Sequence, residues 1–418
     1  MEYPVAQAGG VEAIVVELVR GLASEFSLVL VSDDNAESLA ASGLAPLVAK
    51  QFPWRVMQGT SATAKHLAVA LNQAGVELAH FHLGGTYAWG SRIARHCPIP
   101  MTARLGIPVV ITNHFVQPAL EGYCGDSRPL WFKRAFFPVA WGNRLLVLNH
   151  ARREFTDFLY EYHLLRRIFW PLRKKIGHMY HSALDVQEPG PALTADCRPP
   201  VILMVATIAP RKYQRVLIEA FDRIASAHPE WTLRIVGYVG DNAYYEQIRT
   251  MDAARRLGKR LEFAGPLGRA DTMSAMHAAS IFVGQGLALQ EAIFRGCACV
   301  SFSFPSNSDL TEHGRTGSLS APNHPAALAD TFVRFSFMSN SEVVEHGRTG
   351  LVSPPNDPAA LAKTLETLIT QPSLRRQLAE QGRASILEKG MTRQQMVRRH
   401  ADLYRSLLAC EAKSISRR

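Results

Sequence analysis

The sequence has no apolar run that approaches the roughly 18 residues needed to cross a bilayer as a helix. Its six cysteines follow no framework spacing, which argues against a disulfide-stapled scaffold. A basic-then-apolar leader is also missing at the N-terminus. Despite a net charge of +10, the sequence contains no recognised nucleic-acid-binding motif. These absences predict a cytoplasmic protein with reduced thiols and no nucleic-acid partner.

What is present is the composition of an ordinary globular protein, with enough residues for two or three domains. The chain has 418 residues, of which 47% are apolar and 20% are charged. Its basic excess favours anionic partners such as phosphates or the acidic inner face of a membrane, although a generally basic proteome would give the same balance. Cys297 and Cys299 lie in the apolar run GCACV, where small buried thiols are expected rather than metal ligands.

Short apolar runs alternate with helical patterns along the whole chain. The predicted strands are 27–33, 77–83, 107–115, 144–150, 201–208, 232–240, 260–267 and 280–284. Continuous apolar strands that alternate with helices form parallel sheets covered on both faces, and ligands bind beyond the carboxyl ends of such strands. The Pro-rich stretch 185–200 has no periodicity. We therefore predict two Rossmann-like domains joined by a linker, with a cleft between them.

Two short motifs suggest phosphate binding. Gly9 and Gly10 directly precede a helical pattern, where backbone N–H groups and the helix dipole attract anions, although a simple turn uses the same residues. Arg211 and Lys212 follow the strand 201–208 on a loop that leads into a helix. They are either phosphate ligands or solvated surface cations.

Two further residues suit a binding site. Glu291 is expected in the first turn of a helix that begins near Gly286, where it either accepts hydrogen bonds from ribose hydroxyls or complements the helix dipole. His114 comes shortly after VVIT, near the carboxyl end of the predicted strand 107–115. It either faces the cleft or is a hydrogen-bonded core histidine.

Taken in order, these stretches resemble the retaining glycosyltransferases of family 4, also called glycosyl transferases group 1. The matching segments are Gly9-Gly10, VVITNH, LLVLNH, YHSALD, PRKYQRVLIEAF, RIVGYVG, FAGPL, GLALQEAIFRGCACV, EHGRTG and PAALA. The final MTRQQMVRRHADLYRSLL resembles the family's C-terminal helix. The resemblance covers nearly the whole chain. Its individual motifs are loose, but their order and spacing are specific.

The resemblance implies the GT-B fold, an α/β architecture of two Rossmann-like domains facing a cleft. An N-terminal acceptor domain would span 1–186, a linker 187–200, and a nucleotide-sugar domain 201–391. Residues 392–418 would form a C-terminal helix that crosses back to the first domain.

The resemblance also implies roles for individual residues. Lys212 would hold the donor diphosphate and His114 would lie by the acceptor, as the catalytic residues. The other residues expected to bind the donor are Gly9, Gly10, Thr207, Arg211, Pro266, Leu267, Gly286, Leu287, Glu291, Ser306, Asn307 and Ser308. No metal or other cofactor is expected, because cations and helix N-termini would stabilise the leaving diphosphate.

The implied function is transfer of a sugar from a nucleotide-sugar to a saccharide or lipid-linked acceptor in cell-surface glycan synthesis. Basic and aromatic residues are interleaved at 128–144 and 160–177. This composition suits docking on an anionic membrane surface, on the inner face of the membrane, but also suits helices packed on the first domain with solvated basic edges.

Three departures from the family pattern favour an alternative, a weak or inactive GT-B protein that binds nucleotide or a partner. Only eight residues precede Gly9, so either the family's first strand is missing or the start of the sequence has been assigned too late. Thr207 stands where many members have Arg, a charge that Arg211 could replace. The family's first Glu lies eight positions before the ribose-binding Glu, and Val283 occupies that position here, which indicates a deleted loop.

The hexapeptide EHGRTG occurs at 312–317 and again at 345–350. The repeat extends over 303–335 and 336–368, which indicates a tandem duplication. Gly314 lies 23 residues after Glu291, which is the family spacing for the loop at the nucleotide site. We therefore expect the first copy at that site and the second as an added turn–strand–helix unit at the edge of the domain.

Overall fold

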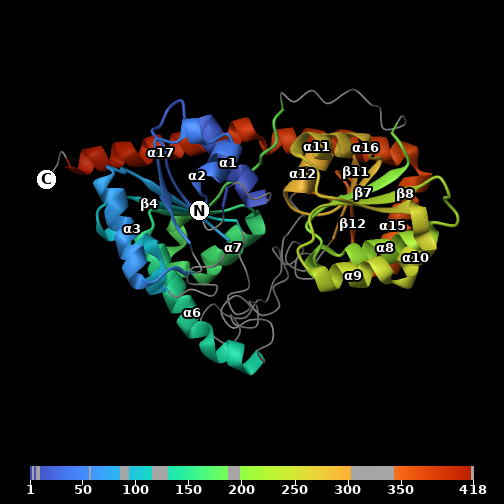
Figure 1. The fold of residues 1–418 in the computed structure, drawn as a ribbon, viewed down its shortest axis with the longest axis horizontal. Helices are drawn as coiled ribbons and strands as arrows, with labels where there is room; N and C mark the ends of the chain where they lie inside the picture. Colours follow the sequence, from blue (N-terminus) through green and yellow to red (C-terminus); the bar gives the residue numbers. More distant parts are fainter. Residues whose placement is uncertain are drawn as a thin grey trace. The chain divides into compact units, whose positions relative to one another are not determined.

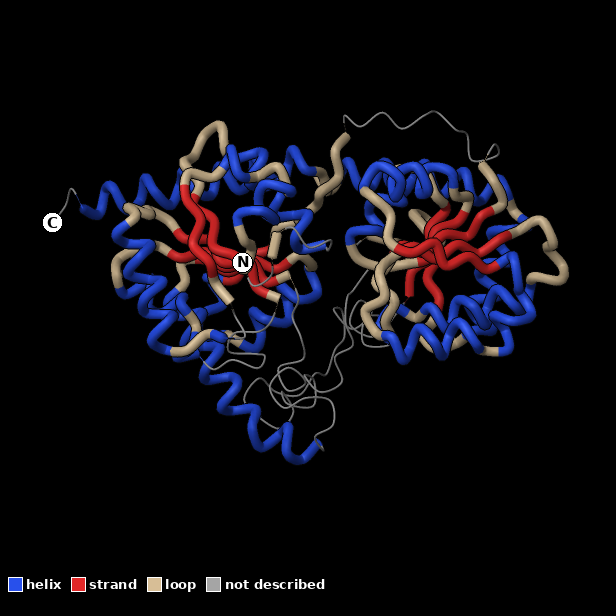
Figure 2. Tube along the Cα trace, in the orientation of Figure 1, coloured by secondary structure: helices blue, strands red, loops and turns tan. Residues whose placement is uncertain are grey.

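The structure, a computed structural model, describes residues 1, 4–5, 10–55, 58–84, 94–114, 130–186, 198–302 and 343–415. The described residues form two compact units, each built around parallel sheet covered by helices (Figure 2). The first unit contains described residues of 1–183 and of 393–415. The second contains described residues of 184–302 and of 343–392. The predicted GT-B fold class is confirmed.

The first unit alternates strands and helices in the predicted manner (Figure 1). Its α-helices and strands are α1 (Gly10–Leu22), β1 (Val29–Ser32), α2 (Ala36–Ala41), β2 (Lys50–Pro53), α3 (Ser61–Gln73), β3 (Ala79–Leu83), α4 (Pro98–Arg104), β4 (Val109–Asn113), α6 (Leu130–His150), β5 (Arg153–Thr156), α7 (Leu159–Ile168), β6 (Ile176–His178) and α17 (Arg393–Ile415). Short 3-10 turns lie at Ala45–Leu47, Ala94–His96 and Trp170–Lys175.

The strands of the first unit fall into two separate parallel sheets. β1 pairs with β2, and β3, β4, β5 and β6 form a four-stranded sheet in that order. β4 is buried at all five of its residues, which explains its continuous apolar sequence. Among the described residues, no strand joins β1 to β3.

One predicted strand of the first unit is wrong. Residues 144–150 form the last two turns of α6, and the strand follows at β5. Arg144, Val147 and Leu148 are buried, and their spacing of three and one places them on one face of a helix. A short apolar run such as LLVLNH fits a buried strand and a buried helix equally well, so its sequence could not decide.

The C-terminal helix α17 packs on the first unit, as predicted from the fold family. A Cβ atom on Gly21 of α1 would come within 2.4 Å of Val397 Cγ2 on α17. Arg393 of α17 forms an ion pair with Glu17 at 3.1 Å, and Arg405 forms one with Glu25. The glycine in α1 therefore lets the two helices approach closely.

The second unit has a single six-stranded parallel sheet in the order β12-β11-β10-β7-β8-β9. Its strands are β7 (Val201–Val205), β8 (Thr232–Val236), β9 (Leu261–Gly265), β10 (Ile281–Val283), β11 (Ala298–Phe302) and β12 (Leu351–Ser353). Its α-helices are α8 (Gln214–Ile224), α9 (Asn242–Thr250), α10 (Asp252–Leu257), α11 (Arg269–Ala278), α12 (Leu287–Phe294), α15 (Pro358–Thr370) and α16 (Pro372–Glu388), and 3-10 turns lie at Pro210–Lys212 and Gly258–Arg260. The first strand of the unit, β7, lies inside the sheet between β10 and β8.

Burial of Cys297 and Cys299 agrees with the sequence prediction. Both residues are within 1% of full burial, and burial raises the pKa of the Cys297 thiol to about 11 and that of the Cys299 thiol well above its ordinary value. Cys299 lies on β11, and its neighbours in the strand complete a fully buried pattern.

The second EHGRTG copy forms a tight turn that leads into β12. Glu345 pairs with Arg348 across the turn, and Gly347 has φ of 77°. β12 is an edge strand of the sheet, paired with β11. Leu361, Leu365 and Leu368 of the following helix α15 are fully buried in the core of the unit. The first copy lies outside the described residues, so its expected place at the nucleotide site stays a prediction.

Candidate functional site

The order of the strands in the second unit defines where a ligand would bind. The chain passes from β7 to β8 and β9 on one side of the sheet, and from β10 to β11 and β12 on the other. β7 and β10 are neighbours, so the topological switch point lies between them. Ligands of such sheets bind outside the carboxyl ends of the strands at this point. The loop after β7 carries Thr207, Arg211 and Lys212. The connection after β10 carries Gly286 and leads into α12 at Leu287.

The loop after β7 presents a half-buried cation. Lys212 ends the 3-10 turn Pro210–Lys212, and Tyr213 takes a left-handed conformation with φ of 61° before α8 begins. Burial, with a smaller effect from Arg211, lowers the pKa of the Lys212 ammonium to about 8. Within the part of the chain that the structure describes, no carboxylate pairs with this ammonium. A half-buried ammonium without a counter-charge is an attractive ligand for an anionic group.

The loop after β10 contacts the loop after β7. Buried Gln285 donates a hydrogen bond from Nε2 to the carbonyl oxygen of Arg211, at 3.0 Å. Gly286, with φ of 71° and ψ of −147°, is the residue before α12, and it adopts a conformation that side chains rarely allow. Leu287 is the first residue of α12. The structure therefore brings Arg211, Gly286 and Leu287 to one edge of the sheet.

Glu291 lies in the second turn of α12 rather than in its first turn, because the helix begins at Leu287. Its carboxylate is largely buried and pairs with the Arg269 guanidinium of α11 at 3.1 Å. Dipole complementation is therefore not its role, since that effect is confined to the first turn. The ion pair fixes the carboxylate of Glu291 beside the N-terminal end of α11.

The remaining predicted donor residues of the second unit lie on the same edge of the sheet. Thr207 follows β7, and a Cβ atom on Gly240 would come within 2.5 Å of its Cγ2 atom. Pro266 and Leu267 follow β9, which is three strands from β10 in the sheet order. Gly10 is the first residue of α1 in the first unit. Gly9, Ser306, Asn307 and Ser308 lie outside the described residues.

His114 of the first unit belongs to a cluster of buried histidines at the carboxyl end of β4. Its Nδ1 atom lies 2.9 Å from Asp157 Oδ2, and its Nε2 atom lies 2.9 Å from His82 Nδ1. His181 Nδ1 lies 2.7 Å from the second oxygen of Asp157. Both nitrogens of His114 therefore have partners in the protein, and the acceptor role predicted for it stays a prediction.

Asp157 holds the charge of this cluster. Burial by itself would raise its pKa, but the nearby His114 and His181 together lower that pKa well below the usual range. The ligand atoms of His114, Asp157 and His181 lie within 4.8 Å of one another, so these three residues could hold a metal ion. The separation of 2.9 Å between His114 and Asp157 is that of a charge-assisted hydrogen bond, and His181 lies at ion-pair distance from the other oxygen of Asp157.

Sequence reasoning missed Gln285, Arg269 and Asp157. Gln285 stands between two glycines in VGQGL, a pattern that signals a backbone turn but not a hydrogen bond to a distant loop. Arg269 and Glu291 are 22 residues apart, and Asp157 and His114 are 43 apart. Only the parallel sheet brings these pairs together, so no local pattern could reveal them.

A known family matches part of the chain. Residues 191–336 match the family model described as glycosyl transferases group 1. No curated protein sequence matches the chain. Among solved structures, HepE of Anabaena in complex with UDP and glucose is 15% identical with a TM-score of 0.64, over 96% of this chain and 97% of that one.

Two further solved structures have the same fold at similar distance. A glycosyltransferase from Rickettsia africae is 13% identical with a TM-score of 0.64, over 95% of this chain and 94% of that one. The sucrose-phosphate synthase of Thermosynechococcus elongatus is 18% identical with a TM-score of 0.63, over 96% and 94%. The family match and the shared GT-B fold together support a glycosyltransferase of group 1.

Proposed function

We propose that the protein transfers a hexose, with retention of configuration, from a nucleoside-diphosphate sugar to a saccharide or lipid-linked acceptor in cell-surface glycan synthesis. The observation that carries the proposal is the Lys212 ammonium, which is half-buried at the switch point of the second unit and has no counter-charge among the described residues. Since solved structures of this fold include one in complex with UDP and glucose, UDP-sugars are the first donors to test.

The chemistry follows from the charges at this edge of the sheet. Breaking the bond between the sugar and the diphosphate leaves negative charge on the departing phosphate oxygen. The Lys212 ammonium and the backbone N–H groups at the start of α12 would stabilise that charge in place. The Glu291 carboxylate, fixed by Arg269, would accept hydrogen bonds from the ribose hydroxyls. His114 would lie by the acceptor.

This arrangement makes a metal ion unnecessary, so we expect sugar transfer to continue in excess EDTA. The measurement is release of UDP from a panel of UDP- and GDP-sugars, with and without the chelator, in the presence of candidate saccharide acceptors. Loss of all transfer on chelation, restored by a divalent cation, would contradict the metal-free proposal.

A second candidate function has its own observation. Only Gly284, Gln285 and Gly286 separate β10 from α12, which leaves no room there for a longer loop with a further acid. A GT-B protein that binds nucleotide but transfers sugar weakly or not at all would fit. Calorimetric binding of UDP together with no turnover of any nucleotide-sugar would select this alternative, whereas turnover would eliminate it.

We also propose that the first unit docks on an anionic membrane surface during the reaction. Trp170, Arg173 and Lys174 are exposed on the 3-10 turn after α7, and Trp131 of α6 is 70% exposed. Exposed tryptophan beside basic side chains suits the headgroup region of a bilayer. Within the described residues, none of the helices combines the length and the apolar character needed to cross a membrane.

Co-sedimentation with vesicles tests the docking. The chain should pellet with phosphatidylglycerol-containing vesicles, and Trp170→Ala with Arg173→Ala should reduce the bound fraction several-fold. Arg255→Ala, an exposed change in the second unit, is the matched control. Binding that ignores the anionic lipid content and the salt concentration would contradict the proposal.

A further inference from the structure

Three side chains of the first unit converge at the carboxyl edge of its four-stranded sheet. His114 directly follows β4, Asp157 directly follows β5, and His181 lies three residues after β6. These strands are neighbours, and β4 pairs with β5 through Asn113 and Thr156. His114 and Asp157 are the next residues of the two segments, so the register places them side by side. The carboxyl edge of a parallel sheet is where ligands bind.

The ligand atoms of these three residues are close enough to share one ion. His114 Nδ1 is 2.9 Å from Asp157 Oδ2, and His181 Nδ1 is 2.7 Å from Asp157 Oδ1. One ligand atom from each residue lies within 4.8 Å of the other two. Bonds of about 2.0–2.2 Å from a zinc ion to nitrogen and oxygen place neighbouring ligand atoms roughly 3 Å apart. The three residues therefore need only a small adjustment to surround an ion.

The hydrogen bonds behind His181 determine where its proton lies. His400 Nδ1 is 2.8 Å from the carbonyl oxygen of Met396, which can only accept, so this nitrogen carries a proton. In the neutral ring His400 Nε2 is then an acceptor, and His181 Nε2 donates to it at 3.3 Å. His181 Nδ1 is therefore left with a lone pair. It lies beside Asp157 Oδ1, which is also an acceptor.

Two acceptors at 2.7 Å repel each other unless a positive charge lies between them. A proton on His181 Nδ1 is one way to supply this charge, but a hydrogen bond also requires that the N–H group point at its acceptor. Both His181 Nδ1 and Asp157 Oδ1 are buried, and neither has a hydrogen-bond partner among the described residues. Two atoms that are close without pointing at each other are arranged as ligands of a common ion.

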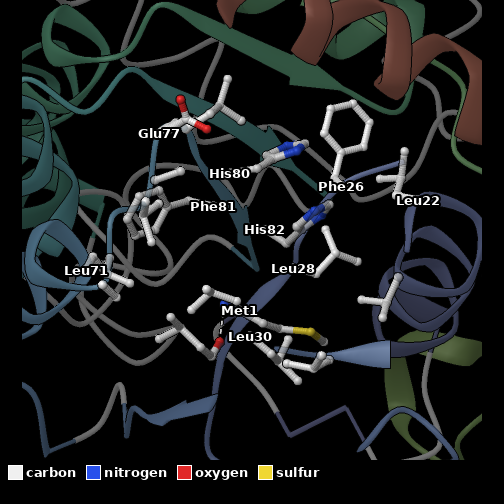
Figure 3. Close-up of a pocket in the computed structure, with 18 of the residues that line it drawn as sticks. Met1, Leu22, Phe26, Leu28, Leu30, Leu71, Glu77, His80, Phe81 and His82 are labelled. Carbon is white, nitrogen blue, oxygen red and sulfur yellow. Dashed lines mark hydrogen bonds between the residues drawn. The ribbon is translucent and has the colours of Figure 1, made fainter. Parts of the chain in front are cut away.

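His114 is supported in the same way through its second ring nitrogen. Its Nε2 atom is 2.9 Å from His82 Nδ1, so a proton at this position is shared with His82 and leaves His114 Nδ1 free for an ion. The ring of His82 is held in turn by that of His80, which lies on the same face of β3 and stacks on it at 4.3 Å (Figure 3). Metal-bound histidines almost always form a hydrogen bond through the other nitrogen.

Asp157 supplies the negative charge that attracts an ion. Its side chain is 14% exposed, and no Lys or Arg in the described part of the chain pairs with it. The rings of His114 and His181 beside it are buried. A buried carboxylate between two neutral rings lacks a counter-charge, and this is costly. A divalent cation would provide that counter-charge.

We propose that His114 Nδ1, His181 Nδ1 and the Asp157 carboxylate bind one zinc ion at the carboxyl edge of the four-stranded sheet. Two imidazole nitrogens favour zinc over Mg²⁺ and Ca²⁺, which take oxygen ligands. Each carboxylate oxygen lies beside one histidine nitrogen, so the protein offers four ligand atoms, the number in a structural zinc site. The ion joins the segments that follow β4, β5 and β6 and stabilises the first unit.

This ion has no part in the proposed departure of the diphosphate. The expectation that no metal is needed concerned donor-binding residues of the second unit, whereas the three ligands belong to the first. The apolar clusters of the first unit do not include the ligands, so the chain should stay folded without the ion. Sugar transfer in EDTA therefore tests a different claim.

The test uses the full chain, freed of metal with dipicolinate and titrated with zinc chloride by calorimetry. We expect one ion per chain with a Kd on the order of 1 µM or below. The thermal midpoint should rise by about 5–10 °C when free zinc exceeds the Kd by about 100-fold, and magnesium chloride should have neither effect. X-ray absorption of the zinc-loaded chain should show nitrogen and oxygen ligands at about 2.0–2.2 Å, without sulfur at about 2.3 Å.

Variants identify the ligands. Asp157→Asn keeps the size of the side chain but removes its charge, and His181→Gln removes a ligand nitrogen. Each should weaken zinc binding at least about 100-fold, since loss of an outer-sphere partner alone costs about 10–100-fold. Asp252→Asn and His163→Gln, at exposed positions, are the matched controls and should keep the affinity of the unaltered chain.

The proposal is overturned if the unaltered chain binds no zinc, a result that would leave a protonated His181 as the partner of Asp157. It is also overturned if folded Asp157→Asn and His181→Gln bind zinc as tightly as the unaltered chain, or if sulfur ligands are found. The stoichiometry, the thermal midpoint and the ligand set are measured on the unaltered chain. They decide the matter even where a variant fails to fold.

Discussion

Lys212 illustrates how a single residue can be prepared for an anion by what surrounds it. Its ammonium is half-buried, and desolvation lowers its pKa to about 8, so it remains mostly protonated at pH 7. Ion pairing with a substrate phosphate would replace the solvation that burial has removed.

Replacement of this lysine tests the site directly. Lys212→Ala should lower the turnover of a nucleotide-sugar roughly 10²–10³-fold, because a preorganised charge on the leaving group is lost. Lys212→Arg should retain part of the activity, and Arg255→Ala at an exposed site should have no effect. Steady-state release of nucleoside diphosphate measures all three variants. Undiminished transfer by Lys212→Ala would refute the role.

Glu291 allows a separate prediction, because its carboxylate is fixed by Arg269. Glu291→Gln should weaken donor binding by roughly 10–100-fold, since a charged hydrogen-bond acceptor contributes about 1.5–3 kcal/mol. Isothermal titration with UDP gives the dissociation constant. Glu246→Gln, in an exposed ion pair with Arg249, is the matched control. Equal UDP affinity in both variants would show that Glu291 does not contact the nucleotide.

At the scale of single residues, the sequence indicated candidates for the site but not the partners of those candidates. Lys212, Gly286 and Glu291 could be named because each lies at a recognisable strand-to-helix junction. The contacts that position them, Gln285 with Arg211 and Arg269 with Glu291, join separate loops. Such contacts depend on strand order, which a local pattern does not contain.

Among the elements, α6 shows that a short apolar segment does not distinguish a strand from a helix. Its last turns were predicted as a strand, because LLVLNH is apolar and short. The buried ion pair of Arg144 with Glu154 of β5 explains the error, since it allows a charged residue to lie at a fully buried helical position. The neighbouring strands β3 and β4 were predicted correctly because their apolar runs are bounded on both sides.

This ion pair provides a prediction about stability. Arg144→Ala should lower the free energy of unfolding by about 3–5 kcal/mol, because the Glu154 carboxylate is left buried without a counter-charge. Arg144→Met combined with Glu154→Leu should recover most of the loss. Arg255→Ala, which removes an exposed pair with Asp252, should cost under about 0.5 kcal/mol. Urea unfolding measures each variant, and a cost for Arg144→Ala as small as that of Arg255→Ala would contradict the account.

The duplicated segment supports another prediction at this scale. Deletion of 303–335 leaves the buried Leu351 and the Asp357 N-cap of α15 in place. Deletion of 336–368 substitutes Ser318 and His324 for them, by alignment of the two copies. The second deletion should therefore be the less stable by about 2–5 kcal/mol, while UDP binding survives in both as long as they are folded. Thermal unfolding and calorimetry test this, and equal stability would show that either copy can form β12.

For the molecule as a whole, the buried histidines predict a stability that depends on pH. Burial, together with repulsion from neighbouring histidines, lowers the pKa of His400 to about 3 and those of His80 and His82 well below 6.5. Between about pH 6.5 and 3 the unfolded chain binds protons that the folded chain does not. The free energy of unfolding should therefore fall as the pH drops below 6.5, by up to about 1.4 kcal/mol per pH unit for each histidine.

Urea unfolding at pH 7.5 and 5.5 measures this dependence. His400→Gln should have a smaller difference between the two pH values than the unaltered chain. His163→Gln, at an exposed position on α7, should keep the full difference. Stability that is unchanged or higher at pH 5.5 would contradict the prediction.

The fold class could be predicted from the sequence because alternation of strand and helix is repeated along the whole chain. The sequence does not predict that the strands of the first unit fall into two sheets. Pairing partners in parallel sheets are far apart in the sequence, and β1 and β3 have equally apolar neighbours whether or not a strand lies between them. The division of these described strands into two sheets was therefore visible only in three dimensions.

The second copy of the repeat has a consequence for how this sequence can change over generations. Since β12 and α15 are formed by residues 351–370, mutations at these positions would disturb elements of the core of the second unit. The equivalent positions of the other copy lie outside the described residues. When the two copies are aligned, Ser318 corresponds to the buried Leu351, and His324 corresponds to the capping Asp357. The two halves of the repeat therefore differ at a position that is buried and at a position that caps a helix in the second copy.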